Sequence, residues 1–172
     1  MTGLRHGFFL LAEIALRLCV VPTLRARLLE LLGATVGRNV RVYECRFMNL
    51  AAGFRNLSLG NDVHIGTGCL LDLQGPVCIG TGSTLSPRVM LISHSDPGSA
   101  HGSLLAVRYP PESSGVSIGE QCWIGAGATL LSGSFVADHT VVGAMALVRG
   151  RLEPNSLYGG VPAKRIKNLS TT

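Results

Sequence analysis

The sequence predicts an all-β protein wound as a triangular parallel β-helix, on three observations. An aliphatic residue returns every six positions through much of the chain, and a glycine or alanine often follows it. Glycine supplies 22 of the 172 residues, which a helical bundle would not tolerate because glycine costs backbone entropy in a helix. Aromatic residues make up only 5% of a chain that is 47% hydrophobic. A narrow prism filled by columns of aliphatic side chains accounts for all three observations.

The six-residue period is clearest in the C-terminal half of the chain. There the aliphatic residues are Ile118, Ile124, Leu130, Val136, Val142 and Val148. The position four residues further on is small, at Cys122, Ala128, Ser134, Thr140 and Ala146. Earlier members of the series are Val36, Val42, Leu59, Ile65, Leu71 and, after two inserted residues, Ile79, Leu85 and Leu91.

A six-residue period fits a short strand followed by a tight turn, and three such units make one coil. We expect coils to stack at about 4.8 Å, the ordinary spacing of paired strands. The aliphatic residue should point into the prism and the small residue should flank it at a corner. We expect the glycine after the aliphatic residue to relieve the turn.

Residues 1–32 are predicted to form a separate helical segment. Apolar residues recur there at intervals of three and four, at Leu4, Phe8, Leu11, Ile14, Leu18, Leu24, Leu28 and Leu31. Pro22 divides the pattern into two helices, and Gly33 ends the second. We expect two helices packed on the main body. The alternative is an amphipathic element that lies on a membrane surface.

The repeat is interrupted at about residues 93–115, a polar stretch rich in Gly, Pro and Ser. A long excursion from a compact repeat is usually functional or disordered, so we expect an extruded loop. The hexads resume after this loop and are followed by a tail. We therefore assign residues 33–168 to one β-helical domain with its C-terminal tail.

Charge and cysteine content restrict the function. The formal net charge of +5 comes without a basic run interleaved with aromatics, so nucleic-acid binding is not predicted. The cysteines are odd in number and show neither C-x-x-C pairing nor metal-binding spacing. This pattern indicates buried thiols in a reducing compartment, so we expect a cytoplasmic protein. The cysteines are Cys19, Cys45, Cys69, Cys78 and Cys122. The apolar stretch 7–21 is too short to span a bilayer and lacks a convincing signal cleavage site.

Two motifs and the loop resemble a known family. The WIG tripeptide at 123–125, the GGVPAK motif at 159–164 and a histidine loop after the third coil resemble the hexapeptide-repeat acetyltransferases. The galactoside, maltose and polysaccharide O-acetyltransferases are the most similar members, and the resemblance covers about residues 33–168. It implies a left-handed β-helix, although parallel crossovers are normally right-handed. It also implies a homotrimer with active sites between subunits. The implied reaction is transfer of acetyl from acetyl-CoA to a sugar-like acceptor, for example in polysaccharide biosynthesis.

Such a transfer needs a base for the proton of the acceptor. The histidines that the chain offers are His6, His64, His94, His101 and His139. His94, in the sequence LISHSDP, is similar to the family's catalytic histidine, so we expect it to act as general base by direct transfer. His101 is expected to contact the acceptor. Asp96 and a backbone carbonyl both remain open as the group that orients the ring of His94, and Asp96 is also a candidate acceptor contact.

The transfer also needs a donor for the oxyanion and a groove for acetyl-CoA. The resemblance implies that the backbone N–H of Ala126 is the oxyanion donor, although similar proteins often have serine there. It places Trp123 beside the acyl group, with packing at a subunit interface as the alternative. The expected contacts of acetyl-CoA are Trp123, Gly125, Ala126, Gly143, Ala144, Arg149, Lys164 and Lys167. No metal is expected.

Two other functions stay open at this point. A non-catalytic β-helix, a scaffold or binding protein, would keep the hexads without needing a histidine loop. A carbonic-anhydrase-like enzyme would bind zinc through three histidines, but the seven-residue spacing of His94 and His101 does not match that pattern. O- and N-acetylation also remain open. Galactoside-type members bind the sugar through an asparagine where this chain has Gly66, so the acceptor differs or is held differently.

Overall fold

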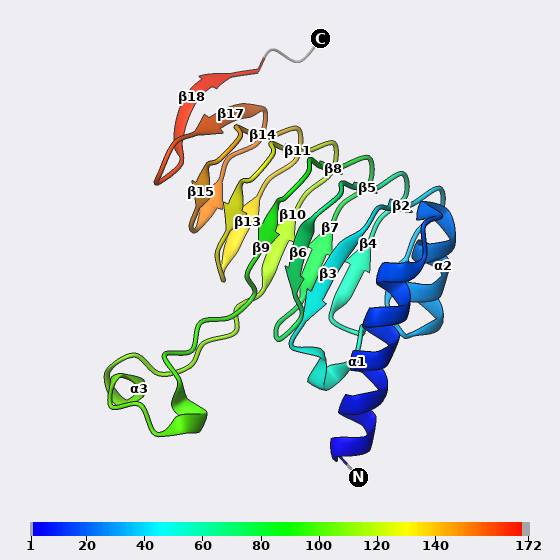
Figure 1. Cartoon of the computed structure of the whole chain (residues 1–172). Helices are drawn as coiled ribbons and strands as arrows, with labels where there is room; N and C mark the ends of the chain where they lie inside the picture. Colours follow the sequence, from blue (N-terminus) through cyan, green and yellow to red (C-terminus); the bar gives the residue numbers. More distant parts are fainter. Residues whose placement is uncertain (1, 170–172) are drawn as a thin grey trace.

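The computed structural model describes residues 2–169, and the side chains of residues 7–169. It shows a three-sided β-helix with two helices at its N-terminal end, a loop that projects from its side and a short hairpin at its C-terminal end (Figure 1). The predicted fold class, a left-handed parallel β-helix of hexapeptide repeats with an N-terminal helical segment and an extruded loop, is confirmed.

Each face of the prism is one parallel sheet. The first face holds β1 (Thr35–Val36), β4 (Leu57–Leu59), β7 (Val77–Ile79), β10 (Val116–Ile118), β13 (Ser134–Val136) and β16 (Arg151–Leu152). The second face holds β2 (Arg41–Val42), β5 (His64–Ile65), β8 (Thr84–Leu85), β11 (Trp123–Ile124), β14 (Val141–Val142) and β17 (Ser156–Gly159), to which β18 (Lys164–Asn168) is added antiparallel. The third face holds β3 (Cys45–Met48), β6 (Cys69–Asp72), β9 (Met90–Leu91), β12 (Thr129–Leu130) and β15 (Leu147–Val148).

The predicted aliphatic columns fill the prism. Every predicted hexad residue from Leu59 to Val148 is at most 2% exposed. The small residues predicted at the corners, from Cys122 to Ala146, are buried as well. Removal of this aliphatic surface from water is the main force that holds the coils together.

The glycine after the aliphatic residue has a different role from the predicted one. At Gly125 a Cβ atom would lie 2.5 Å from the backbone nitrogen of Ala144, and at Gly119 it would lie 2.2 Å from the carboxylate of Asp138. Neither glycine has a positive φ. The left-handed turn positions are instead taken by residues such as Gly127 and His139. The repeat therefore keeps glycine because the next coil occupies the space of a side chain, and not because the turn is strained.

The N-terminal helices follow the predicted boundaries. The helix α1 spans Thr2–Leu18 and α2 spans Pro22–Leu31, with Pro22 in the first turn of α2 and Gly33 at φ 105° after its end. Arg25 is 2% exposed and holds the linker between the helices. Its guanidinium donates to the carbonyls of Leu16, Cys19 and Val42, which ties both helices to β2.

The predicted apolar stripe of α1 faces away from the β-helix. The side that packs on η1 (Leu50–Ala52) and β3 carries Phe9, Glu13 and Leu16. The stripe residues are exposed, at 57% for Phe8, 69% for Leu11, 52% for Ile14 and 77% for Leu18. The spacing of apolar residues therefore located the helix correctly. Because both sides of α1 are apolar, that spacing did not show which side packs against the β-helix.

The predicted loop leaves and rejoins the β-helix at the corner between the third and first faces (Figure 1). It contains η2 (Ser99–His101) and α3 (Leu105–Arg108), and a β-bridge between Ser95 and Glu112 closes its base. After the loop, β10 pairs with β7 in register, with Val116 opposite Val77.

The cysteines only partly match the prediction of buried thiols. All are free, and Cys45, Cys69 and Cys122 are buried, but Cys78 is exposed on the first face. Cys45 and Cys69 are register partners on β3 and β6. Burial raises the pKa of Cys69 to about 11 and the pKa of Cys45 further, so both remain protonated thiols at neutral pH.

Candidate functional site

His94 lies at the base of the loop and is held by a carboxylate from the preceding coil. Its Nδ1 lies 2.5 Å from Oδ2 of Asp72, the last residue of β6. The Asp72 side chain is fully buried, and the His94 side chain is 26% exposed. When Nδ1–H donates to the carboxylate, Nε2 is the unprotonated nitrogen and is available to accept a proton.

Asp72 is fixed by hydrogen bonds to both of its oxygens. Oδ2 accepts from the backbone N–H groups of Ser93 and His94 and from the Ser93 hydroxyl. Oδ1 accepts from Nδ2 of Asn49 and from the backbone N–H of Gln74. Burial alone would raise the pKa of Asp72, but the hydrogen bonds, with His94 and Asn49 foremost, lower that pKa below its ordinary value. The carboxylate is therefore charged at neutral pH and favours the Nδ1–H form of the ring.

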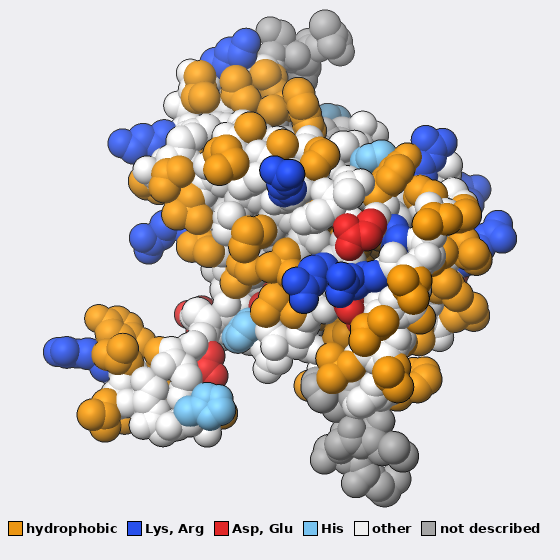
Figure 2. Space-filling view, viewed as in Figure 1, with side chains coloured by type: hydrophobic (Ala, Val, Ile, Leu, Met, Phe, Trp, Pro, Cys, Tyr) orange, Lys and Arg blue, Asp and Glu red, His pale blue; other side chains and the backbone are white. Residues whose placement is uncertain are grey.

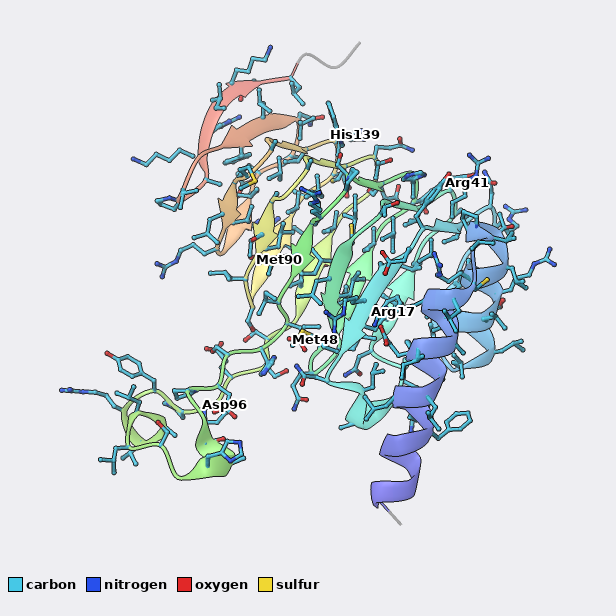
Figure 3. The ribbon with its side chains drawn as sticks, in the orientation of Figure 1. Arg17, Arg41, Met48, Met90, Asp96 and His139 are labelled. Carbon is cyan, nitrogen blue, oxygen red and sulfur yellow. The ribbon has the colours of Figure 1, made fainter. Side chains whose placement is uncertain are left out.

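Asp96, which the sequence offered as the orienting group, does something else. Its carboxylate accepts from the backbone N–H groups of Gly98 and Ser99 and from the Ser99 hydroxyl. These bonds, above all those from Ser99, lower the pKa of Asp96. Asp96 is exposed at the base of the loop (Figure 3) and shapes the turn into η2, so Asp72 replaces it as the partner of the His94 ring.

Asp72 was missed because it lies 22 positions before His94 in the chain. A signal was present, since a carboxylate stands between two leucines, Leu71 and Leu73, that are both fully buried. The pairing of Leu70 with Met90 shows how the two sites meet, because it places Asp72 beside residue 92 in the next coil.

A second group of predicted residues lies at the corner between the second and third faces. Gly125 and Ala126 follow β11, and Gly143 and Ala144 follow β14 one coil above. Both alanines are exposed. Among the described residues, no hydrogen bond uses the N–H of Ala126 or of Ala144. This corner therefore presents backbone donors to whatever lies against it.

Trp123 and the two lysines adjoin this corner. Trp123 is 55% exposed on the outer side of β11, and its Nε1 donates to the hydroxyl of Ser86 at 2.9 Å. Lys164 lies opposite Gly159 in the hairpin of β17 and β18, and Lys167 lies opposite Leu157. Both lysines are exposed. Arg149 does not join them, because it follows β15 and so lies at the other end of the third face.

The other histidines are dispersed. His101 is exposed on η2, away from the body of the β-helix. His64 is a wall residue on β5, with its ring 5.0 Å from that of Tyr43, and His139 is exposed at a left-handed turn position (Figure 3). The side chain of His6 lies outside the described residues. In the described part of the chain, no three His, Cys, Asp or Glu side chains are grouped as metal ligands would be.

The two corners are too far apart to act on one acetyl group within a single chain. His94 lies four residues after Met90, and Ala126 lies three residues before Thr129, the register partner of Met90. Seven residues of largely extended chain span roughly 20 Å, whereas proton transfer needs contact at about 3 Å. Within one chain the His94 corner and the Ala126 corner therefore do not meet.

No protein-family model matches the chain. WbbJ from Escherichia coli K12, named a lipopolysaccharide biosynthesis O-acetyl transferase, is 35% identical over 121 residues, which are 67% of this chain and 59% of WbbJ. WcaF from the same organism, named a colanic acid biosynthesis acetyltransferase, is 31% identical over 149 residues, which are 86% of this chain and 76% of WcaF.

Two further comparisons give one structural neighbour and one sequence relative. A hexapeptide-repeat acetyltransferase from Vibrio cholerae, solved with acetyl-CoA, superimposes with a TM-score of 0.79 at 18% identity and covers 95% of this chain and 86% of its own. A mitochondrial gamma carbonic anhydrase from Arabidopsis thaliana is 31% identical over 129 residues, which are 66% of this chain but only 46% of that protein.

Proposed function

Because the chain belongs to the hexapeptide-repeat acetyltransferases, we propose that it moves an acetyl group from acetyl-CoA to a hydroxyl of a sugar-like acceptor, with His94 as general base. The observation that carries this proposal is the pairing of His94 with a buried, charged Asp72. The names of WbbJ and WcaF favour an acceptor that belongs to a surface polysaccharide.

The chemistry assigns one task to each nitrogen of the ring. Nδ1–H stays on Asp72, and Nε2 accepts the proton of the acceptor hydroxyl as its oxygen attacks the thioester carbonyl. The backbone N–H of Ala126 stabilises the oxyanion of the tetrahedral intermediate. The C–S bond then breaks, and the imidazolium returns the proton to the sulfur of CoA. The acceptor leaves as an acetyl ester.

We further propose a homotrimer in which the His94 corner of one subunit meets the Ala126 corner of its neighbour. The separation of the two corners within one chain supports this arrangement. The outer surface of the third face between them is largely apolar, with Leu70, Met90 and Leu147 pointing outward, and Figure 3 shows Met48 and Met90 on it. Burial of such a surface between subunits would drive assembly.

Two features support the Ala126 corner as the place where acetyl-CoA binds. The free N–H groups of Ala126 and Ala144 form a column that can bind the amides of the pantetheine arm, and Lys164 and Lys167 supply cations for its phosphates. Gly125, which the stacking of the coils requires to be a glycine, adjoins Ala126 and stays in the proposed site. Arg149 lies at the corner between the third and first faces, where His94 also lies, so it would reach acetyl-CoA only from the neighbouring subunit.

The test is release of free CoA from acetyl-CoA with a panel of sugars, nucleotide sugars and amino sugars, followed with a thiol reagent. We expect release of CoA that depends on the acceptor, at a rate that falls at least about 10³-fold in His94→Ala. The control is His139→Ala, which removes a histidine from an exposed turn and should leave the rate unchanged. Alkaline hydroxylamine distinguishes an ester product from an amide. Full activity of His94→Ala would refute the assignment of the base, and the absence of both CoA binding and release would favour a non-catalytic β-helix.

A further inference from the structure

The outward side of α1 is apolar along its described length. Seen along the helix, Phe8, Leu11, Ile14, Ala15 and Leu18 share one half of its circumference, and all are exposed. A helix on the surface of a soluble protein normally carries polar residues on that side. The apolar surface continues through the linker, where Val20 is 86% exposed, and onto α2 at Leu24 and Leu31 (Figure 2).

The charge of the chain is concentrated in the same region. Residues 1–60 contain eight arginines and three glutamates, whereas residues 61–172 contain seven basic and seven acidic residues. The whole net charge of +5 therefore belongs to the two helices and the coil on which they pack. Glu13 is buried, where its carboxylate accepts from the backbone N–H of Phe47. Arg27 is exposed, and Arg17 is partly exposed at 3.8 Å from Glu44.

An exposed apolar stripe with an excess of cations beside it fits the surface of an anionic bilayer. The apolar side chains can enter the boundary between headgroups and acyl chains, and the arginines can meet phosphate groups. Contact with a second copy through this surface would bring the same cations together, which opposes that contact. None of the helices in the described part of the chain has the length and hydropathy that a membrane span requires.

The helix is also close to the candidate site. It packs on η1, and Phe9 contacts Phe54 just beyond η1 at 6.1 Å between ring centroids. Asn49, which precedes η1, donates to Asp72, which in turn holds His94. A bilayer against α1 would therefore lie near the base of the site.

We propose that the outward surface of α1, the linker and α2 is a docking surface for an anionic phospholipid bilayer. The proposal does not depend on the proposed enzymatic activity. It uses Phe8, Leu11, Ile14 and Leu18 as the inserted residues and the exposed Arg17 and Arg27 as the electrostatic contact.

The experiment is flotation of the full chain with vesicles of phosphatidylcholine alone and with vesicles that contain about one third phosphatidylglycerol. We expect binding to the anionic vesicles that weakens with salt and falls at least about tenfold in the double variant Leu11→Gln/Leu18→Gln. The control is Val107→Gln, which removes an exposed apolar side chain from the loop, away from α1 and α2. His94→Ala should bind vesicles like the wild type, which separates this proposal from the enzymatic one.

The oligomeric state is measured on the same samples by sedimentation. We expect the double variant to keep the oligomeric state and the circular dichroism spectrum of the wild type. Wild-type protein that does not float with anionic vesicles would overturn the proposal. So would a double variant that still floats but dissociates into smaller species, because the surface would then be an interface between copies.

Discussion

The third face of the prism ends in two corners that are built differently. At the corner after β9, side chains form the candidate site: His94, Asp72, Ser93 and Asn49 are joined by hydrogen bonds around one buried carboxylate. At the corner before β12, the main chain presents its N–H groups, and the side chain of Ala126 is a single methyl group. The first corner should therefore be sensitive to the chemistry of its residues, and the second to their shape.

Among the residues around His94, the largest effect is expected from Asp72→Asn. An amide is a poorer acceptor for Nδ1–H and carries no charge, so the ring loses its preferred tautomer and the stabilisation of the imidazolium. We expect kcat to fall about 10²–10⁴-fold while the KM for acetyl-CoA is unchanged. Steady-state release of CoA measures both parameters.

Asp96→Asn is the matched control for this prediction. It makes the same chemical change at a carboxylate that bonds the turn into η2 and not the His94 ring, and it should alter kcat by no more than a few-fold. Equal losses in the two variants would show that the carboxylates act through the folding of the loop and not through the His94 ring.

Gly125→Ala tests the corner that depends on shape. The new methyl group would lie 2.5 Å from the nitrogen of Ala144, so the coils must separate locally. We expect a loss of about 1–3 kcal/mol in the free energy of unfolding, measured with urea. Gly143→Ala, whose Cβ would meet Tyr158 at 3.3 Å, should cost less than about 1 kcal/mol. Equal costs would contradict the stacking role of Gly125.

The lowered pKa of Asp72 also predicts a dependence of stability on pH. A carboxyl group whose pKa is lower in the folded state stabilises the fold above its ordinary value of 3.8, and this contribution is lost as the pH falls through the folded value. Wild type should therefore exceed Asp72→Asn by about 1–2 kcal/mol at neutral pH, and the difference should shrink below pH 3.8. A difference that is constant with pH would assign the effect to packing.

The smallest expected effect is that of Ala126→Ser. Since the proposed oxyanion donor is the backbone N–H, a hydroxyl on the side chain should leave kcat within about threefold of the wild type. A tenfold change in either direction, measured in the same CoA-release assay, would mean that the side chain at this corner takes part in the reaction.

The sequence predicted the features that repeat in every coil, and it missed the contacts between one coil and the next. The inward columns followed from the period of six, because each column residue meets the same surroundings in every coil. The contact of Asp72 with His94 depends on the register between coils, which two inserted residues and the loop obscure. The role of Gly125 was missed for the same reason, since the atoms that exclude a side chain there belong to the next coil.

The N-terminal helices show another limit of periodicity. The spacing of Phe8, Leu11 and Leu18 located α1, and Pro22 marked the start of α2. The packed side of α1 could not be chosen from the sequence, because Phe9 and Leu16 on the opposite side are equally apolar. Which side meets the β-helix is decided by Phe54 and by the buried Arg25, contacts that only the folded chain provides.

The loop between β9 and β10 leaves the β-helix and returns to it without disturbing the stack. Val116 pairs with Val77 in regular register, as it would if β10 followed β9 directly. The β-bridge between Ser95 and Glu112 joins the two strands of chain at the base of the loop. Beyond this bridge the loop can be lengthened, shortened or exchanged while His94 keeps its contact with Asp72 on β6. The structure thus keeps the His94–Asp72 pair on the β-helix and apart from the projecting segment, so the length and sequence of that segment can change without altering the pair.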